Sequence, residues 1–196
     1  MSEKQVIVLA SGNAHKIREI SDMLPEFKVV GYKELGFNEE IVEDGLTLTF
    51  YENALIKAKT VSKALNLPAL ADDSGICVDA LNGQPGIYSA RYAGDGDDKH
   101  NNQLLLKNME GKTNRKAKFV CCMVYYKPNG EIITATGETH GEIMHAEQGE
   151  NGFGYDPLFF SYDLNMCLGV ADAQTKNTIS HRYRAIVGLK EKLKEN

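Results

Sequence analysis

The chain has 196 residues, of which 42% are hydrophobic and 25% are charged, a composition typical of globular proteins. This length suits one large domain, or one domain with a small appended lobe, whose core needs no disulfide or metal. The net charge of −5 argues against a broad nucleic-acid-binding surface, because such a surface requires clustered Lys and Arg side chains.

Membrane-spanning and zinc-binding patterns are also missing. No apolar run approaches the ~18 residues that span a bilayer, and the first residues show no signal-peptide pattern. We therefore expect a cytoplasmic protein with no membrane partner. The four cysteines form no C-x-x-C pair, which argues against zinc and favours buried free thiols. They are Cys77, Cys121, Cys122 and Cys167.

The first half of the chain alternates apolar runs with helical patterns. Ile17, Ile20 and Leu24 recur at helical spacing after a turn signal. Thr49 and Glu52 form a capping box at the start of a longer amphipathic segment. The expected elements are a strand at 5–10, a turn at 11–13, a helix at 14–24, a strand at 28–31, a long helix ending near 65, and a short strand at 69–71 that leads into the acidic segment 72–75.

The second half is richer in strands. The run 119–126 is strongly apolar and indicates a strand buried on both faces, and 128–130 is a hairpin signal. Strands and helices mix without strict alternation, which favours an α/β fold with a mixed central sheet flanked by helices. The other expected elements are a short helix at 101–108, strands at 131–136 and 138–144, a Gly-rich loop at 148–157, and a last helix from about Ser180 with Tyr183, Ile186, Val187 and Leu193 facing inward.

The turn after the first strand reads Ser11-Gly12-Asn13-Ala14-His15-Lys16. A helix N-terminus presents backbone N–H groups and the positive end of the helix dipole, and Lys16 adds a full charge one turn later. Gly12 lets a phosphate approach the backbone, so the turn is a candidate phosphate-binding site. It is not a P-loop. The alternative is an ordinary turn in which Ser11 or Asn13 caps the helix.

A second motif, Asp72-Asp73-Ser74-Gly75, follows a short apolar run. Two adjacent carboxylates are costly to bury unless they are paired, and a bound Mg²⁺ would offset that cost. The nearby acidic segment 39–45 could supply a further ligand. One carboxylate could act as the general base for water. The alternative is a solvated acidic turn, because Asp-Ser-Gly is also good turn chemistry.

Two further motifs lie toward the C-terminus. The segment 149–157 (GENGFGYDP) holds Phe153 between glycines, where it could stack on a base or plug the core of an ordinary Gly-rich turn. Ser180-His181-Arg182 opens the last helix, with Lys176 upstream. Its donors suit a carbonyl or phosphate oxygen, and the alternative is a capped helix with surface His and Arg.

These motifs belong to a set of six segments that follow one another in a fixed order over nearly the whole chain. With them, the sequence resembles the inosine triphosphate pyrophosphatase family. The segments are Ser-Gly-Asn-x-x-Lys at 11–16, Glu-Asn-Ala-Leu-Ile-Lys-Ala at 52–58, Ala-Asp-Asp-Ser-Gly at 71–75, Pro-Gly-Ile-Tyr-Ser-Ala-Arg-Tyr-Ala-Gly at 85–94, Gly-Phe-Gly-Tyr-Asp-Pro-Leu-Phe-Phe at 152–160 and Ser-His-Arg at 180–182.

The resemblance implies one domain over residues 1–196, elongated and two-lobed, with a cleft between the lobes and a homodimeric state. It implies Mg²⁺-dependent hydrolysis of ITP, dITP and XTP to the nucleoside monophosphate and pyrophosphate. Asp73 would be the catalytic base, and Asp73 and Glu43 would bind the metal. The implied substrate-binding residues are Ser11, Gly12, Asn13, Ala14, His15, Lys16, Ser74, Phe153, Gly154, Tyr155, Asp156, Lys176, His181 and Arg182.

The expected base selectivity follows from donor placement. His181 and Arg182 would donate to the 6-oxygen of hypoxanthine or xanthine, and would face the 6-amino group of adenine as donor against donor. Two rivals stay open at this point: a septum-inhibitor-type pyrophosphatase acting on modified pyrimidine nucleotides, and a non-catalytic nucleotide sensor. The GFGYD loop and the Ser-His-Arg motif argue against the first, and the Asp72–Asp73 pair against the second.

Overall fold

The computed structural model describes residues 3–41 and 49–195. Contacts between Cα atoms divide the chain into two compact units. Unit 1 comprises Met1–Asp73, Cys122–Thr136 and Ala185–Asn196, and unit 2 comprises Ser74–Cys121 and Gly137–Arg184.

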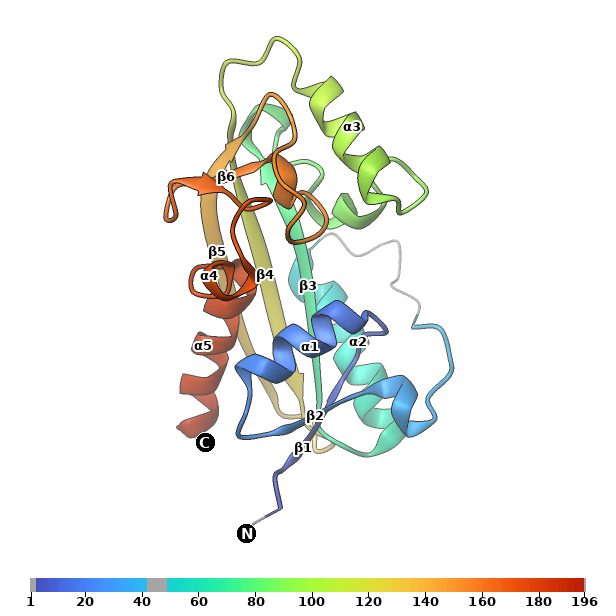
Figure 1. The fold of residues 1–196 in the computed structure, drawn as a ribbon. Helices are drawn as coiled ribbons and strands as arrows, with labels where there is room; N and C mark the ends of the chain where they lie inside the picture. The colour runs from blue at the N-terminus through green and yellow to red at the C-terminus, as the bar shows by residue number, and fades with distance from the viewer. Residues whose placement is uncertain (1–2, 42–48, 196) are drawn as a thin grey trace. The chain divides into compact units, whose positions relative to one another are not determined.

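Helices and strands are interspersed along the chain (Figure 1). The α-helices are α1 (Ala14–Met23), α2 (Phe50–Leu65), α3 (Asp98–Asn108), α4 (Ala173–Lys176) and α5 (His181–Lys194). The strands are β1 (Val6–Leu9), β2 (Lys28–Gly31), β3 (Ala69–Val78), β4 (Lys116–Tyr126), β5 (Ile132–Ile143), β6 (Phe159–Ser161) and β7 (Met166–Cys167). Short 3-10 helices are η1 (Tyr32–Leu35), η2 (Asp79–Leu81), η3 (Gly86–Arg91) and η4 (Asp156–Leu158).

The strands form one seven-stranded sheet in the order β2-β1-β3-β4-β5-β6-β7. β1 pairs with β2 and β3 in parallel, whereas β5–β6 and β6–β7 are antiparallel. The expected α/β fold with a mixed, helix-flanked sheet is therefore confirmed. In the parallel register, Leu9 lies opposite Leu70, and Ala10 N–H donates to the Leu70 carbonyl at 2.8 Å. The turn that follows Leu9 thus lies beside the continuing part of β3, which carries Asp72 and Asp73.

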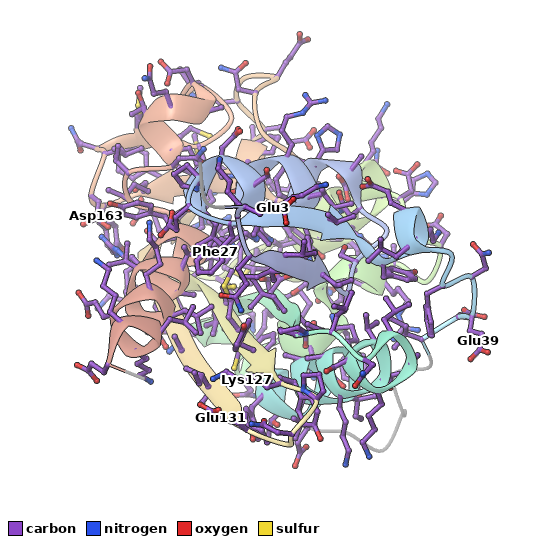
Figure 2. The ribbon with its side chains drawn as sticks, turned by 90° about the horizontal axis from the view of Figure 1, so that it is seen from below. Glu3, Phe27, Glu39, Lys127, Glu131 and Asp163 are labelled. Atoms are coloured by element: carbon purple, nitrogen blue, oxygen red, sulfur yellow. The ribbon has the colours of Figure 1, made fainter. Side chains whose placement is uncertain are left out.

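The core of unit 1 lies between α2 and the strands that it covers. Ala54, Ala58 and Val61 of α2 are fully buried against Val8 and Ala69. Thr49 caps α2 as expected, because its Oγ1 accepts a hydrogen bond from Glu52 N–H at 3.1 Å. The β4–β5 turn of this unit closes with a 2.8 Å ion pair between Lys127 and Glu131 (Figure 2).

The core of unit 2 joins β3, β4 and β6 to α3. Its centre is aromatic, with the ring centroids of Phe119 and Phe159 at 4.6 Å. Leu105 of α3 and Met109, which follows the last residue of α3, are fully buried in the same cluster, together with Ile76 of β3. This cluster also contains Tyr155, so the Gly-rich loop that carries Tyr155 is anchored in the core of unit 2.

Two sequence predictions about elements are wrong, and so is one alternative. The alternative of an acidic turn is wrong, because β3 runs without a break through Asp72-Asp73-Ser74-Gly75. The two strands expected at 131–136 and 138–144 are one long strand, β5. In α5, Tyr183 and Val187 are exposed, while Ala185, Ile186 and Leu189 are buried. Two apolar stripes run along that helix, and sequence periodicity alone did not tell which one faces the core.

The other outcomes concern the cysteines and the membrane. All four thiols are free, and three of them are buried, with Cys77 half-buried. The prediction of buried free thiols is therefore confirmed except for the partial exposure of Cys77. Within residues 3–41 and 49–195, no helix combines the length and the apolar character that crossing a bilayer requires.

Candidate active site

The turn between β1 and α1 is open to solvent. Gly12, Asn13, Ala14 and His15 are all exposed. Asn13 is the helix cap, since its Oδ1 accepts from the N–H groups of His15 at 2.9 Å and Lys16 at 3.2 Å. Ser11 Oγ in turn accepts from Asn13 N–H. The alternative in which Asn13 caps the helix is therefore correct for the N–H groups of His15 and Lys16. Because Asn13 already occupies these two donors, a bound phosphate would depend more on nearby lysines.

The two aspartates of β3 are held by helices on opposite faces of the sheet. Successive side chains of a strand point in opposite directions. Asp72 Oδ1 lies 3.2 Å from Lys16 Nζ of α1, and Asp72 is buried. Asp73 Oδ2 accepts from Asn53 Nδ2 of α2 at 3.1 Å. The positions of α1 and α2 around β3 can be followed in Figure 1.

Lys57 connects this carboxylate pair with the open turn. Its Nζ donates to the backbone oxygen of Asp72 at 2.7 Å and lies 3.9 Å from Asp73 Oδ1. Lys57 also lines a cavity of about 390 Å³ in unit 1, together with Ser11 and Gly12. The cavity is large enough for a phosphate group, and its wall therefore joins the turn to the lysine that contacts both aspartates.

Lys33 is a second cation beside the turn. A Cβ atom built on Gly12 would lie 3.2 Å from Lys33 Nζ, so glycine leaves room for that ammonium group. Lys33 also lines the 390 Å³ cavity, as do the acidic residues Glu39 and Glu40. Glu39 points away from the ribbon into solvent (Figure 2).

The oxygen donors of unit 1 fit the kind of site that Mg²⁺ prefers. Mg²⁺ is usually bound by one or two carboxylates, with substrate phosphates and waters completing its coordination. Asp73 offers one such carboxylate, with a side chain that is 13% exposed. Glu43, the other expected ligand, lies outside the described residues. Within the described part of the chain, no three His, Cys, Asp or Glu side chains converge on one point.

Asp72 differs from what a solvated acidic turn would show. Its side chain is 1% exposed and is paired with the ammonium group of Lys16. The cost of burying this carboxylate is therefore offset by a lysine within the protein. Asp73 is the aspartate that retains access, with a side chain that is 13% exposed.

The Gly-rich loop of unit 2 is wrapped around Asp156. Asp156 Oδ2 accepts from Phe153 N–H at 3.0 Å and from Lys176 Nζ at 2.7 Å. A Cβ on Gly152 would lie 2.1 Å from that oxygen, and Gly152 has φ +74°, so only glycine fits there. Asp156 and Lys176 are both buried. Their side chains therefore hold the loop in shape.

Tyr155 also points into the protein. Its hydroxyl donates to the Ser89 carbonyl at 2.5 Å, and its side chain is packed in the core of unit 2. Burial raises the pKa of Tyr155, and the nearby Tyr92 and Asp98 act in the same direction. The hydroxyl thus stays protonated at neutral pH, and a substrate could contact Tyr155 only through its backbone.

Phe153 is the exposed aromatic ring of this loop, with 36% of its surface accessible. Lys176 Nζ lies 4.4 Å from the ring centroid and Arg182 Cζ 5.9 Å from it. The alternative in which Phe153 plugs the core is therefore wrong. A ring that is accessible and flanked by cations is a suitable surface for stacking a base.

His181 and Arg182 are not surface residues. They are 6% and 2% exposed, and the His181 ring stacks on Phe119 with centroids 5.0 Å apart. Ser180 caps α5, since its Oγ accepts from Tyr183 N–H at 3.1 Å. The expected cap is confirmed, and the alternative with surface His and Arg is wrong. Ser74, the first residue of unit 2, is half-buried in β3.

Comparison with known proteins assigns the family. A model of the Ham1 family matches residues 7–192. The chain belongs to the Ham1 family. A dITP/XTP pyrophosphatase from Clostridium tetani is 48% identical, over 97% of this chain and 96% of the relative. A dITP/XTP pyrophosphatase from Haemophilus influenzae is 47% identical, over 97% of this chain and the full length of the relative.

Solved structures of Ham1 proteins share this fold. The Staphylococcus aureus Ham1 protein is similar with a TM-score of 0.89 and 42% identity, and 97% of this chain and 99% of that one are covered. A HAM1 protein from Coxiella burnetii gives 0.89 and 39%, with 98% and 100% covered. The family resemblance drawn from the motifs is therefore confirmed.

In this Ham1-family chain, the sequence patterns did not indicate three polar residues of the candidate site in unit 1, namely Asn53, Lys57 and Lys33. Asn53 and Lys57 lie in the 52–58 segment that marks the family, and their spacing of four places both on one face of α2. That spacing was a usable signal. Lys33 offers no such signal, because only the pairing of β1 and β2 brings it next to Gly12.

Proposed function

We propose that this protein hydrolyses non-standard purine nucleoside triphosphates, namely ITP, dITP and XTP, to the monophosphate and pyrophosphate. Membership of the Ham1 family and the names of its relatives support this activity. The structural observation that carries it is the carboxylate of Asp73. Asn53 and Lys57 hold this carboxylate, and Lys57 lines a cavity with the Ser11–Gly12 turn.

In the proposed reaction, Asp73 takes a proton from a water molecule as that water attacks the α-phosphorus. A bond forms between the water oxygen and the α-phosphorus, and the bond from the α-phosphorus to the bridging oxygen breaks. The positive charges of Lys16 and Lys57 stabilise the pyrophosphate that leaves. Asp73 and Glu43 would hold Mg²⁺, which would supply further positive charge to the phosphate oxygens.

Asn53 and Lys57 also orient the carboxylate of Asp73, the general base of the reaction. The amide of Asn53 fixes Asp73 Oδ2, so the two oxygens of the carboxylate are not equivalent. Lys57 favours the ionised carboxylate, because an opposite charge within about 4–6 Å stabilises the charged form. Proton transfer by a group held in this way contributes about 10²–10⁴ in rate.

We propose that the base of the nucleotide stacks on Phe153 and is selected by the cations around it. His181 and Arg182 carry donors that suit a 6-oxygen and not a 6-amino group. A site with buried donors rejects an analogue that cannot accept from them by as much as about 10⁴-fold. Unit 1 would thus determine the reaction, and unit 2 the choice of base.

A panel of nucleotides with Mg²⁺ tests this function. The wild-type protein is expected to release pyrophosphate from XTP and ITP, with much lower kcat/KM for ATP. Orthophosphate as the first product would mean attack at the γ-phosphorus and would contradict the proposal. Preference for methylated pyrimidine triphosphates would identify a septum-inhibitor-type enzyme, and tight ITP binding without turnover would identify a sensor.

We also propose that the protein acts in the cytoplasm as a homodimer. The family resemblance supports the dimer, and the free thiols fit a reducing compartment. Sedimentation velocity at micromolar concentration is expected to give about twice the 21.7 kDa chain mass. A monomer over that concentration range would contradict the dimer.

A further inference from the structure

The start of α3 contacts the loop that carries Phe153. Asp98 Oδ2 accepts from Gly154 N–H at 2.9 Å, and Asn102 Nδ2 donates to the Gly154 carbonyl at 3.0 Å. Asp98 and Asn102 are four residues apart and therefore lie on one face of the helix. A single helix face thus binds both backbone polar groups of one loop residue.

These contacts fix the backbone around Phe153. The Gly154 N–H belongs to the peptide that joins Phe153 to Gly154, and the Gly154 carbonyl belongs to the next peptide. On the other side, Phe153 N–H donates to Asp156. Two carboxylates therefore hold the N–H groups on either side of the Phe153 side chain. Gly154 has φ +59°, a left-handed conformation that these bonds help to hold.

Asn102 is tied into the protein while it makes this contact. It is 3% exposed, and its Nδ2 also donates to Glu147 Oε1 at 2.9 Å. The adjacent Asn101 is 1% exposed; its Nδ2 donates to the Ala90 carbonyl of η3 at 3.1 Å, and its Oδ1 accepts from Ala93 N–H at 2.7 Å. The start of α3 is therefore anchored to buried parts of unit 2, and the loop is hydrogen-bonded to this anchored helix.

We propose that Asp98 and Asn102 are positioning residues that set the orientation of Phe153 toward the base of the nucleotide. The proposal rests on the proposed function, in which Phe153 stacks on that base. Neither residue touches the reacting phosphate. Their loss therefore changes how well the base is held and selected, and leaves the chemical step itself intact.

Asp98 is the better residue to change, because it is exposed and Asn102 is buried. Asp98→Ala removes the acceptor for Gly154 N–H, and Asp98→Asn retains an oxygen acceptor. Asp95→Ala is the matched control. Asp95 is also exposed, and it accepts from Asp97 N–H and pairs with His100 at the start of the same helix, without a bond to Gly154 among the described contacts.

The expected result in Asp98→Ala is a KM for XTP raised about threefold to tenfold, the range of one net hydrogen bond, with kcat within about twofold of wild type. The ratio of kcat/KM for XTP to that for ATP falls. Asp98→Asn and Asp95→Ala stay within about twofold of wild type in all three quantities. In hydrogen exchange, the peptide that contains 152–155 exchanges faster in Asp98→Ala only.

Three outcomes would overturn the proposal. They are an unchanged KM and exchange rate in Asp98→Ala, a loss confined to kcat, and equal effects in Asp98→Ala and Asp95→Ala. The third would mean that the helix start matters only for general stability. If wild type releases no pyrophosphate from XTP, the proposed function has failed, and the exchange measurement still tells whether Asp98 holds the loop.

Discussion

The charged side chains of the candidate site in unit 1 are more exposed to solvent than those that hold the Gly-rich loop in unit 2. In unit 1, the side chains of Lys16, Lys57 and Asp73 are 19%, 13% and 13% exposed. In unit 2, the side chains of Lys176 and Asp156 are 7% and 4% exposed. The first set retains access and can exchange partners for a phosphate or a metal. The second set is enclosed, and it determines the shape of the loop that presents Phe153.

The largest effect is expected at Asp73. Asp73→Asn keeps the size and the hydrogen-bonding shape but removes the base, so kcat for XTP should fall about 10²–10⁴-fold. The free energy of unfolding should stay close to wild type, because the side chain is not part of a hydrophobic core. Steady-state kinetics and urea unfolding of the same preparation measure both. Near-normal turnover would remove Asp73 from the mechanism.

The next largest effect is on stability and concerns unit 2. Asp156→Ala leaves the ammonium group of Lys176 buried without its carboxylate, so the free energy of unfolding should fall by about 3–5 kcal/mol. Asp156→Asn is a second variant, which keeps an oxygen for Phe153 N–H but also leaves the charge of Lys176 unpaired. The double variant Asp156→Asn/Lys176→Met removes that buried charge, so it should recover part of the stability that Asp156→Asn alone loses. Urea unfolding checks both, and additive losses in the double variant would contradict the account.

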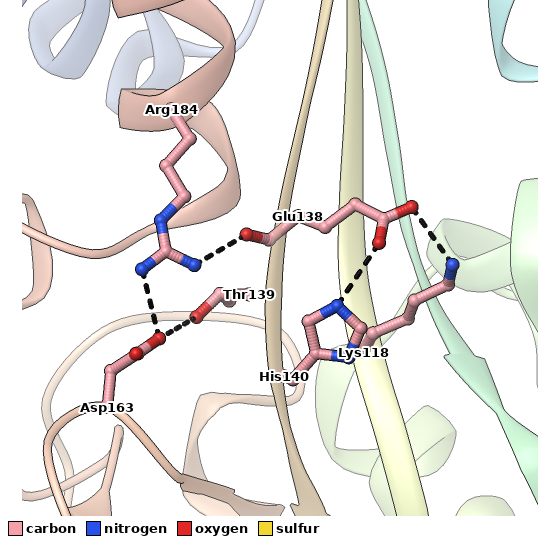
Figure 3. A network of polar contacts seen from close by, with 6 residues as sticks. All are labelled: Lys118, Glu138, Thr139, His140, Asp163 and Arg184. Atoms are coloured by element: carbon pink, nitrogen blue, oxygen red, sulfur yellow. Dashed lines mark hydrogen bonds and ion pairs between the residues drawn. The ribbon is translucent and has the colours of Figure 1, made fainter.

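The control for that experiment is Asp163→Ala. Asp163 pairs with Arg184 at 3.0 Å, and both side chains are about as exposed as surface residues, at 40% and 39% (Figure 3). Ion pairs of this kind contribute about 0–1 kcal/mol. A loss at Asp163 equal to that at Asp156 would mean that burial does not distinguish the two pairs.

The smallest effect is expected at the pair of Lys118 and Glu138, which are 2.9 Å apart on neighbouring strands (Figure 3). The hydrogen bond from Lys118 lowers the pKa of Glu138, and His140 acts in the same direction, against the effect of burial. Because the pKa of Glu138 is lower in the folded state, its ionised form stabilises the fold at pH values above the pKa of an unfolded Glu, about 4.3. This stabilisation is lost as the pH falls through the pKa of the folded state.

Lys118→Met should therefore raise the pKa of Glu138 in an NMR-detected titration. The accompanying loss of stability near neutral pH should be no more than about 1 kcal/mol, because both side chains are over one-third exposed. Lys107→Met, an exposed change on α3, serves as the control. An unchanged pKa of Glu138 would show that the pair does not persist in solution.

Local patterns predicted the helix and strand types well, because caps and periodicity act over a few residues. Asn13 and Thr49 cap helices as their sequence context indicates. The alternative of a turn at 72–75 is wrong, since the turn propensity of Asp-Ser-Gly is overruled by pairing within the sheet. Such pairing depends on residues far away in the chain, and the segment itself carries no sign of it.

The family motifs did not show which contacts each side chain makes within the protein. The structure adds that the side chain of Asp156 holds the loop and that of Tyr155 packs in the core. Asp98 and Asn102 lie outside the six segments, and their contact with Gly154 spans more than 50 residues. Only the fold brings those two residues to the loop.

The division of labour between the two regions can be tested most directly by one ratio, that of kcat/KM for XTP to kcat/KM for ATP, in Lys16→Ala and in Phe153→Ala. Lys16→Ala should lower both values by a similar factor and leave the ratio within about twofold of wild type, because triphosphates are common to both nucleotides. Phe153→Ala should lower the ratio by about tenfold, because a base that the ring no longer holds is also no longer aligned with the donors that distinguish a 6-oxygen from a 6-amino group. A ratio that falls in Lys16→Ala and is unchanged in Phe153→Ala would contradict the account.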